Sequence, residues 1–267
     1  MFKSLSMYKS YFDSFDYNTP EKEHLSLWDR VIHNNRLYFS IRYAKVVLGT
    51  RKQAIIKEYD TQAWIDSSFE ILSFIESVGG KFHITGMENM ISPEGPLLFI
   101  GNHMSTLETM VLPCIVSPYR ETTFVVKDSL VRHPLFKDVM LSRNPIVVSR
   151  IDPRKDFETV MTKGMELLSK GISIIIFPQS TRSIEFKPEE FNSLGVKLAR
   201  KAGVKVVPVA LKTDFWGNGK IIKELGPIDA SKHIHFKFGE PFLVEGNGKS
   251  ENQRIVDFIK SSLNEWQ

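Results

Sequence analysis

The sequence predicts a single α/β domain whose mostly parallel, mixed β-sheet is flanked by helices and preceded by an N-terminal helical segment. Short β-branched and aromatic runs begin at Lys81 and alternate with helical patterns. Several runs are apolar throughout, which is typical of strands covered on both faces. The 267 residues suffice for one such domain with an extension. We therefore expect an N-terminal arm and membrane-surface helical segment at residues 1–78 and the α/β domain at residues 79–267.

Helical periodicity dominates the segment before the domain. Apolar residues recur there at steps of three and four positions: Leu37, Ile41, Ala44 and Leu48. A second helix is predicted to end at the stop signal Gly79-Gly80. Residues 1–20 lack a clear period and end at Pro20. A loosely held arm is expected for them.

Seven strands and four helices are predicted in the domain. The strands cover residues 82–85, 97–100, 122–126, 146–149, 172–177, 205–210 and 234–238, and the helices follow Glu108, Asp156, Asn192 and Glu251. In parallel sheets of this kind, chemistry takes place where the strands end and the loops begin. Polar residues at these ends are therefore the candidate site.

Composition excludes several classes of protein. With 42% hydrophobic and 25% charged residues, the chain is not of the disordered type. No apolar run reaches the roughly 20 residues of a membrane-spanning helix, and no signal-peptide core is present.

The single cysteine, Cys114, cannot form an intrachain disulfide. It follows an apolar helix, so we expect an inert core residue rather than an acyl-carrying thiol.

Basic residues are concentrated in one stretch of the chain. Residues 30–57 contain seven Arg and Lys residues and no Asp or Glu, and aromatic and aliphatic residues lie among them. This mixture suits the surface of an anionic membrane leaflet. The alternative is a helix packed on the domain with solvated basic residues. Binding to nucleic acid would use the same charge but would leave the motifs below unexplained.

His103 and Glu108 form the central candidate pair. Five positions separate side chains by about 140° on a regular helix, so a turn must bring these two together. Glu108 would then orient the imidazole and leave one ring nitrogen as a base. No Gly-x-Ser-x-Gly elbow supplies a nucleophile, so the hydroxyl would belong to a substrate. Alternatively, His103 bonds within the turn and Glu108 favours the helix N-terminus.

Residues 102–108, Asn-His-Met-Ser-Thr-Leu-Glu, resemble the NHxSxxD signature of the glycerolipid acyltransferase family, whose best-known members acylate lysophosphatidic acid. Three further blocks resemble that family's motifs in the same order: residues 147–150, residues 177–183 and residues 206–210. The resemblance covers about residues 82–211, roughly half of the chain. It implies a glycerol-3-phosphate acyltransferase-like fold.

The resemblance also implies roles for individual residues. His103 would be the general base, and Glu108 would replace the usual aspartate. The residues expected to bind the acceptor and its phosphate are Asn102, Ser105, Lys127, Arg150, Thr181, Arg182 and Ser183. Arginine suits phosphate because its planar fork donates paired hydrogen bonds. The alternative for Arg150 and Arg182 is surface pairing with Asp152 or Glu185.

The function implied is O-acyl transfer from acyl-CoA or an acyl carrier protein thioester to the hydroxyl of a lysophospholipid. The leading acceptor is 1-acylglycerol-3-phosphate, which would give phosphatidic acid. Gln179 and Ser180 replace the family's Glu and Gly, so another lyso-lipid, an amino-acid-derived lipid or a non-catalytic lipid-binding role stays open.

Further expectations concern partners and location. We expect a peripheral protein at the cytoplasmic face of an anionic membrane, with no nucleic-acid partner. No cofactor beyond the thioester co-substrate and no metal is expected. His233 and His235 lie two positions apart and would share a strand face like a metal pair, but no suitably spaced acidic or cysteine ligands accompany them. We expect a structural role for both.

Overall fold

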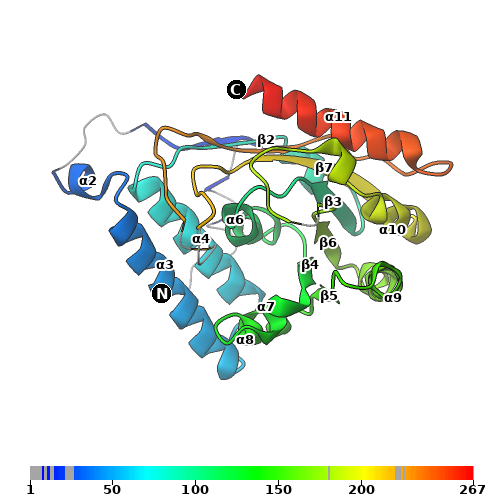
Figure 1. The fold of residues 1–267 in the computed structure, drawn as a ribbon, viewed down its shortest axis with the longest axis horizontal. Helices are drawn as coiled ribbons and strands as arrows, with labels where there is room; N and C mark the ends of the chain where they lie inside the picture. The colour runs from blue at the N-terminus through cyan, green and yellow to red at the C-terminus, as the bar shows by residue number, and fades with distance from the viewer. Residues whose placement is uncertain are drawn as a thin grey trace.

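The computed structural model describes residues 8, 11–12, 15–21, 27–179, 181–219, 224 and 226–266, with the backbone alone at positions 27, 29 and 30. At its centre lies one β-sheet (Figure 1). The strands of the described chain are β1 (Tyr17–Asn18), β2 (Phe82–Thr85), β3 (Leu97–Gly101), β4 (Thr122–Lys127), β5 (Ile146–Val148), β6 (Ser173–Ile176), β7 (Lys205–Lys212) and β8 (Ile234–Phe238). All seven predicted strands are present, within a few residues of the expected bounds.

The sheet has the strand order β1-β2-β8-β7-β3-β6-β4-β5. Strand β1 is antiparallel to β2, and β7 is antiparallel to β8, whereas the other neighbouring pairs are parallel. The mixed, mostly parallel sheet predicted from the sequence is therefore confirmed.

Helices connect the strands. Their bounds are α2 (Leu27–Ile32), α3 (Arg36–Ile55), α4 (Thr61–Ser77), α5 (Glu88–Ile91), α6 (Leu107–Val116), α7 (Asp128–Arg132), α8 (Lys137–Ser142), α9 (Pro153–Ser169), the 3-10 turn η1 (Pro188–Glu190), α10 (Leu194–Ala202) and α11 (Lys249–Glu265). Local sequence explains the starts of the long helices. The Asp60 side chain accepts a hydrogen bond from the Ala63 amide at the start of α4, and Asp152 caps α9, with Pro153 in its first turn.

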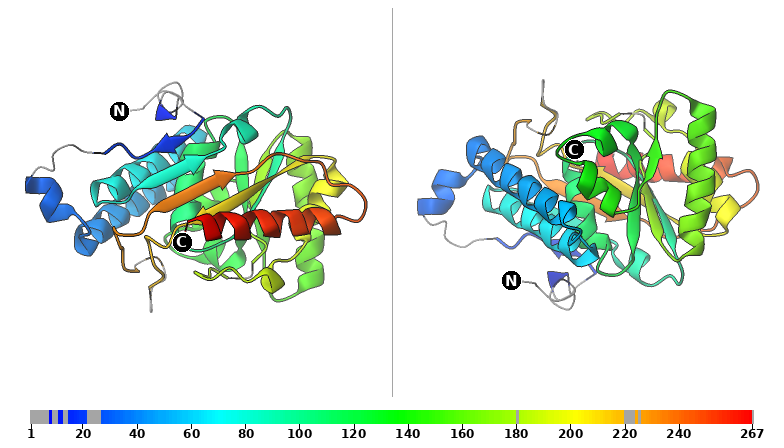
Figure 2. Two further views of the ribbon diagram at one scale, coloured as in Figure 1. Left: turned by 90° about the horizontal axis from the view of Figure 1, so that it is seen from above. Right: turned by 90° about the horizontal axis from the view of Figure 1, so that it is seen from below.

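Helices cover both faces of the sheet. On one face, α3, α4 and α6 pack apolar side chains such as Phe74 and Leu112 against the strands. On the other face, α9, α10 and α11 do the same with residues such as Leu198 and Ile259. Figure 2 shows α11 crossing one face in the left view and the α3–α4 pair at the other face in the right view. Apolar burial on both faces explains why the central strands are apolar throughout.

The N-terminal helices share a core with the sheet. Phe39 and Tyr43 on α3 contact the ring of Trp216 edge to face, with centroids 4.7 and 4.9 Å apart. Trp216 is fully buried and lies in the loop region after β7. Aromatic burial of this size makes a large contribution to stability, so α3 is tightly attached to the domain.

The expectation of a loosely held N-terminal arm is wrong for its described residues. Tyr17 belongs to β1 and is buried, and its hydroxyl donates a hydrogen bond of 2.6 Å to the Glu76 side chain. Tyr8 and Phe12 are buried in the same core. Aromatic side chains without a regular period can still enter a core when they come from a short, irregular segment. The remaining residues of the arm lie outside the described chain.

Candidate active site

The candidate site begins where β3 ends. His103 lies two positions beyond β3, and Glu108 lies in the first turn of α6. Gly101 allows β3 to pass close to β7, because a Cβ at this position would lie only 2.8 Å from the Val209 carbonyl oxygen. A larger residue would push the two strands apart. The close packing of β3 on β7 therefore fixes where the loop from β3 to α6 begins, at the carboxyl end of the sheet.

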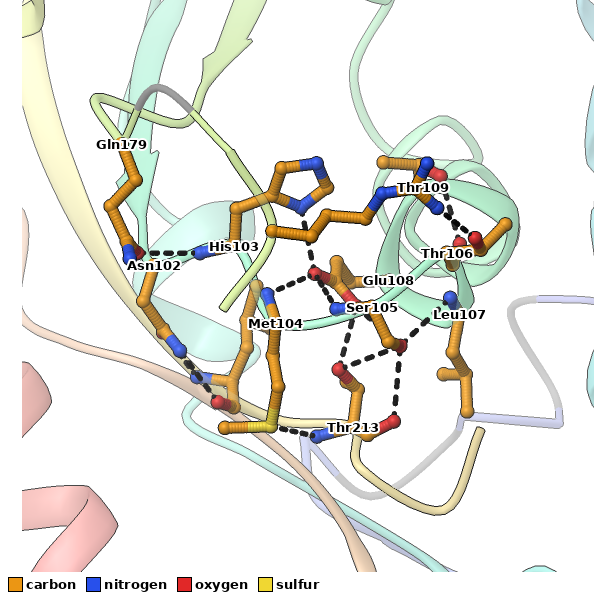
Figure 3. Close-up of polar contacts among 12 residues, drawn as sticks. Asn102, His103, Met104, Ser105, Thr106, Leu107, Glu108, Thr109, Gln179 and Thr213 are labelled. Atoms are coloured by element: carbon orange, nitrogen blue, oxygen red, sulfur yellow. Dashed lines mark hydrogen bonds and ion pairs between the residues drawn. The ribbon is translucent and has the colours of Figure 1, made fainter. Parts of the chain in front are cut away.

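Two contacts orient the His103 ring. Its Nδ1 lies 2.8 Å from the Glu108 Oε1 atom (Figure 3). The ring also stacks on Phe177, with centroids 4.6 Å apart and planes at 9°. A carboxylate can only accept, so Nδ1 carries the proton and Nε2 keeps a lone pair. No described residue hydrogen-bonds to Nε2, and 13% of the side chain is exposed. The turn thus makes the predicted hydrogen bond. The catalytic roles of both residues stay predictions.

Glu108 is fully buried, and hydrogen bonds hold its charge. The backbone amides of Met104 and Ser105 donate to Oε1 at 2.6 and 2.8 Å, and the Thr213 hydroxyl donates to Oε2 at 2.6 Å. Burial by itself raises the pKa of this carboxyl. The bonds from His103, Thr213 and Ser105 outweigh burial, so the pKa of Glu108 is lowered. A carboxyl group with a lowered pKa is ionised at neutral pH, and its negative charge can stabilise a protonated imidazole.

The structure places Asn102 and Ser105 inside the protein. The Asn102 amide group exchanges two hydrogen bonds with the backbone of Leu211 on β7, at 2.8 and 2.9 Å. The Ser105 hydroxyl lies 3.0 Å from Glu108 Oε2 and 3.0 Å from the Thr213 carbonyl oxygen. Both side chains are buried. These contacts hold the loop in place, and the assignment of either residue to substrate binding stays a prediction.

The segment after β6 docks onto the His103 backbone. The Gln179 Oε1 atom accepts a hydrogen bond of 2.8 Å from the His103 amide, and the Ser183 amide donates to the His103 carbonyl oxygen at 3.0 Å. Gln179 is buried, and its Nε2 atom is buried and has no hydrogen-bond partner among the described residues. Ser180 lies outside the described residues. The first and third sequence blocks therefore form one unit around His103.

Arg182 connects this unit to Glu224, which is 42 positions away in the chain. Its guanidinium donates to the Thr106 hydroxyl and forms an ion pair of 2.9 Å with Glu224. About one fifth of each charged side chain is exposed. Arg182 therefore pairs with neither Asp152 nor Glu185, the partners considered from the sequence.

Arg150 lies near Arg182 in an unusual backbone conformation. Its φ angle is +59°, in the left-handed region, and its amide donates to the Asp156 side chain at 2.6 Å. Desolvation lowers the pKa of Arg150, the charge of Asp156 raises it, and the like charge of Arg182 lowers it further. The two guanidinium groups come from separate motifs, residues 147–150 and 177–183, and the tertiary fold places their positive charges near each other.

The other predicted binding residues lie at the edges of this region. Thr181 is exposed, and the Ser183 hydroxyl donates to the Glu185 carbonyl oxygen at 2.7 Å. Lys127 is exposed at the end of β4, directly before α7. Their roles in binding stay predictions.

Sequence reasoning did not find Thr213 or Glu224. Thr213 follows β7 directly, so its position at a strand end was an available signal. The residues on either side of Glu224 lie outside the described chain, and no sequence signal would have paired it with Arg182.

Comparison with known proteins shows the fold and the family of this chain. The crystal structure of the 1-acyl-sn-glycerophosphate acyltransferase of Thermotoga maritima superposes with a TM-score of 0.63 at 19% identity, over 89% of this chain and 95% of that one. Residues 81–212 match the family model described as Acyltransferase. This chain belongs to the acyltransferase family. The matched region contains His103, Glu108, Arg150 and Arg182.

Two relatives of this acyltransferase show how far the likeness extends. The 1-acyl-sn-glycerol-3-phosphate acyltransferase of Pseudomonas aeruginosa is 28% identical over 192 residues, which cover 70% of each chain. The chloroplast enzyme of the same name from Arabidopsis thaliana is 32% identical over 142 residues, 53% of this chain and 38% of the relative. The alignment thus spans less than half of the plant relative's length. No helix in the described ranges has both the length and the apolarity needed to cross a bilayer.

Proposed function

We propose that this acyltransferase transfers a fatty acyl group from acyl-CoA or an acyl carrier protein thioester to the hydroxyl of a lysophospholipid. The proposed acceptor is 1-acylglycerol-3-phosphate and the product phosphatidic acid. The observation that carries this proposal is the 2.8 Å contact between His103 Nδ1 and Glu108, which leaves the other ring nitrogen open as a base. Relatives named 1-acyl-sn-glycerol-3-phosphate acyltransferases support the choice of acceptor.

The proposed reaction has two steps. The acceptor hydroxyl gives its proton to His103 Nε2 while its oxygen attacks the thioester carbonyl carbon, and a tetrahedral intermediate forms. The carbon–sulfur bond then breaks, and the imidazolium returns the proton to the departing thiolate. The buried charge of Glu108 favours the protonated ring between the two steps. No acyl-enzyme is needed, because the nucleophile belongs to the acceptor.

The proposed phosphate site consists of Arg182 with Arg150 nearby. Guanidinium groups can donate paired hydrogen bonds to a phosphate, and their mutual repulsion would be relieved by a bound anion. In this structure the Glu224 carboxylate forms an ion pair of 2.9 Å with Arg182. An acceptor phosphate that uses the same donors would displace this carboxylate. Glu224 therefore acts as an internal competitor for the acceptor.

The proposed membrane contact is one face of α3. Its exposed apolar side chains are Leu37, Ile41, Leu48 and Ile55, which are between 51% and 72% exposed. At about 100° per residue these positions fall within a stripe of about 40°. Lys45 and Lys52 lie along one side of the stripe and are exposed. Phe39 and Tyr43 face the core instead, so α3 both packs on the domain and presents an apolar, basic surface suited to the anionic cytoplasmic leaflet.

The central experiment measures acyl transfer with purified protein. Acyl-CoA and acyl carrier protein thioesters are each offered with a panel of lyso-lipids, and products are identified by mass. His103→Ala should lower kcat by about 10²- to 10⁴-fold, the usual contribution of general-base catalysis. His133→Ala, a change at a histidine outside the site, is the matched control. Near-normal turnover by a folded His103→Ala protein would contradict the mechanism, and transfer to a different lyso-lipid alone would contradict the acceptor.

Point variants of α3 test the membrane contact. Ile41→Glu with Leu48→Glu should reduce flotation with vesicles that contain an anionic phospholipid. Leu243→Glu is the control, because Leu243 is 52% exposed and precedes α11, which covers the other face of the sheet. Equal flotation of both variants would remove α3 from the proposed interface. Deletion of residues 1–78 is unsuitable because α3 and α4 contribute to the domain core.

A further inference from the structure

Three histidines meet on the outer strands of the sheet, away from His103. His83 on β2 and His235 on β8 are directly paired across the two parallel strands, and His233 precedes β8. Each offers a ring nitrogen, and these nitrogens all lie within 4.8 Å of one another. The sequence revealed only the pair in β8. The tertiary structure adds His83, which is 150 positions from His233.

We propose that His83, His233 and His235 form a binding site for a divalent transition-metal ion with the ligand preferences of Zn²⁺. Imidazole nitrogen is a preferred ligand of Zn²⁺, and three histidines leave a fourth tetrahedral position for water. With bonds of 2.0–2.1 Å, tetrahedral ligands lie roughly 3.3 Å apart. His83 Nε2 and His233 Nδ1 are already 3.0 Å apart, in a hydrogen bond whose proton must leave Nδ1 when a metal ion binds there.

Hydrogen bonding orients His83 as a metal ligand. Its Nδ1 lies 2.6 Å from the Asn18 Oδ1 atom on β1. An amide oxygen can only accept, so Nδ1 donates and the Nε2 lone pair points toward His233. Metal-bound histidines commonly donate their second nitrogen in this way, which holds both tautomer and ring orientation. Asn18 therefore has the position of an outer partner of the proposed site.

The third ligand needs a small movement. The His83 ring stacks on His235 with centroids 4.8 Å apart, and His235 stacks on Trp266 with centroids 4.7 Å apart. One ion cannot lie in the planes of stacked rings, so His235 or His83 must rotate on binding. His233 is exposed, and its ring contacts those of His83 and His235, with centroids 5.0 and 6.3 Å apart. A rotation of one or two side chains is enough, because the backbone already gathers all three residues.

The local charges are compatible with a cation. The nearby lysines contact carboxylates: Lys81 contacts Glu21, Lys237 contacts Glu265, and Lys212 and Lys232 share Asp214.

The site would connect both ends of the described chain to the sheet. Asn18 belongs to β1, His83 to β2 and His235 to β8, whereas Trp266 follows α11. His83 and His235 lie on the face that α11 partly covers, opposite the face of α6 and Glu108. A bound ion would therefore stabilise the fold at this edge, and it would take no part in acyl transfer.

Calorimetric titration of Zn²⁺ into the untagged, chelator-treated protein tests the site. We expect one equivalent to bind. His233→Gln should weaken binding by at least about 10-fold, and Asn18→Ala should weaken it by a factor of about 10 as an outer partner. His133→Gln is the matched control and should bind as the wild type does. Because His233 is exposed, its replacement leaves the fold intact, which circular dichroism checks.

A second readout separates this site from other zinc binding. Saturating Zn²⁺ should raise the melting temperature of the wild type and of His133→Gln, but not that of His83→Gln with His235→Gln. Acyl transfer by the double variant should match that of the wild type without metal. Absence of binding to the wild type, or unchanged binding after His233→Gln, would overturn the proposal.

Discussion

Thr213 and Glu108 are 105 positions apart in the chain, yet the Thr213 hydroxyl donates a hydrogen bond of 2.6 Å to the Glu108 carboxylate. Both side chains are completely buried. Thr213 follows β7, and Glu108 lies at the start of α6, so this bond connects two sides of the candidate site. It holds the carboxylate oxygen that does not contact His103. Orientation of the His103 ring therefore depends on a residue outside the sequence motif.

Thr213→Val should weaken this support. Loss of the hydroxyl leaves a buried carboxylate oxygen short of a donor, which costs roughly 1–3 kcal/mol of stability. We expect kcat to fall by about 10-fold or more as the ring loses its orientation, with little change in the KM for either substrate. Thr213→Ser keeps the hydroxyl and should keep most of the activity. A serine variant as impaired as the valine variant would assign the effect to packing.

Glu108→Gln should reduce both activity and stability. The amide NH2 group of glutamine would face backbone and hydroxyl groups that themselves donate hydrogen bonds. The neutral amide also cannot stabilise the positive charge of the imidazolium. We expect a loss of roughly 1–3 kcal/mol at neutral pH, measured by urea unfolding. The exposed residue Glu158 on α9 supplies the control, Glu158→Gln. An unchanged unfolding midpoint in Glu108→Gln would contradict the importance of the buried charge.

The stability difference should depend on pH with a definite sign. The pKa of Glu108 is lowered in the folded protein from its ordinary value of 4.5. Its charged form therefore adds stability above about pH 4.5, and this contribution is lost as the pH falls through the lowered folded pKa. The difference in the free energy of unfolding between wild type and Glu108→Gln should be largest at neutral pH and should become smaller in acid. A gap that widens in acid would mean that the pKa is raised.

Glu224→Gln should favour binding of a phosphorylated acceptor. Loss of the carboxylate removes the ion pair with Arg182, so the phosphate no longer competes with it. We expect the KM for 1-acylglycerol-3-phosphate to fall by a few-fold, about 1 kcal/mol or less as for a partly exposed ion pair, with an unchanged KM for the acyl donor. Glu185→Gln is the control. A higher acceptor KM in Glu224→Gln would mean that Glu224 instead positions Arg182 for binding.

Cys114 should be unreactive in the folded protein. The thiol is fully buried on α6, and burial raises its pKa to about 12. A thiol of this kind contains almost no thiolate near neutral pH. We expect no labelling by a thiol-specific disulfide reagent in the native state and one equivalent after denaturation. Rapid native labelling, or an acyl group recovered on Cys114 after turnover, would restore the acyl-carrying alternative.

Several elements could be predicted from the sequence because their causes are local. Short apolar runs that alternate with helical patterns predicted the seven strands from β2 to β8. The Gly79-Gly80 stop signal predicted the end of α4 correctly. The short helices α5, α7 and α8 were missed because four to six residues show too little periodicity. Strand β1 was missed for the same reason, since its two residues gain their structure from pairing with β2.

The motif around His103 was equally local. Five residues between a strand and a helix can form a turn that joins His103 to Glu108, and the structure makes this contact. Arg182 was expected to pair with Asp152 or Glu185 if it had no role in binding, but its partner is Glu224, more than 40 positions away. Ion pairs between distant segments depend on how loops pack, which local patterns do not encode.

The sequence by itself determined the fold class, the acyltransferase resemblance and the candidate base, because these depend on hydrophobic periodicity and on residues adjacent in the chain. Tertiary structure alone brought Thr213 to Glu108, Glu224 to Arg182 and His83 to the histidines near β8. Each of these contacts joins segments separated by tens of residues or more. The order and direction of strands in the sheet decide such contacts, since the free energy of packing the whole core selects one arrangement from many with the same local pattern.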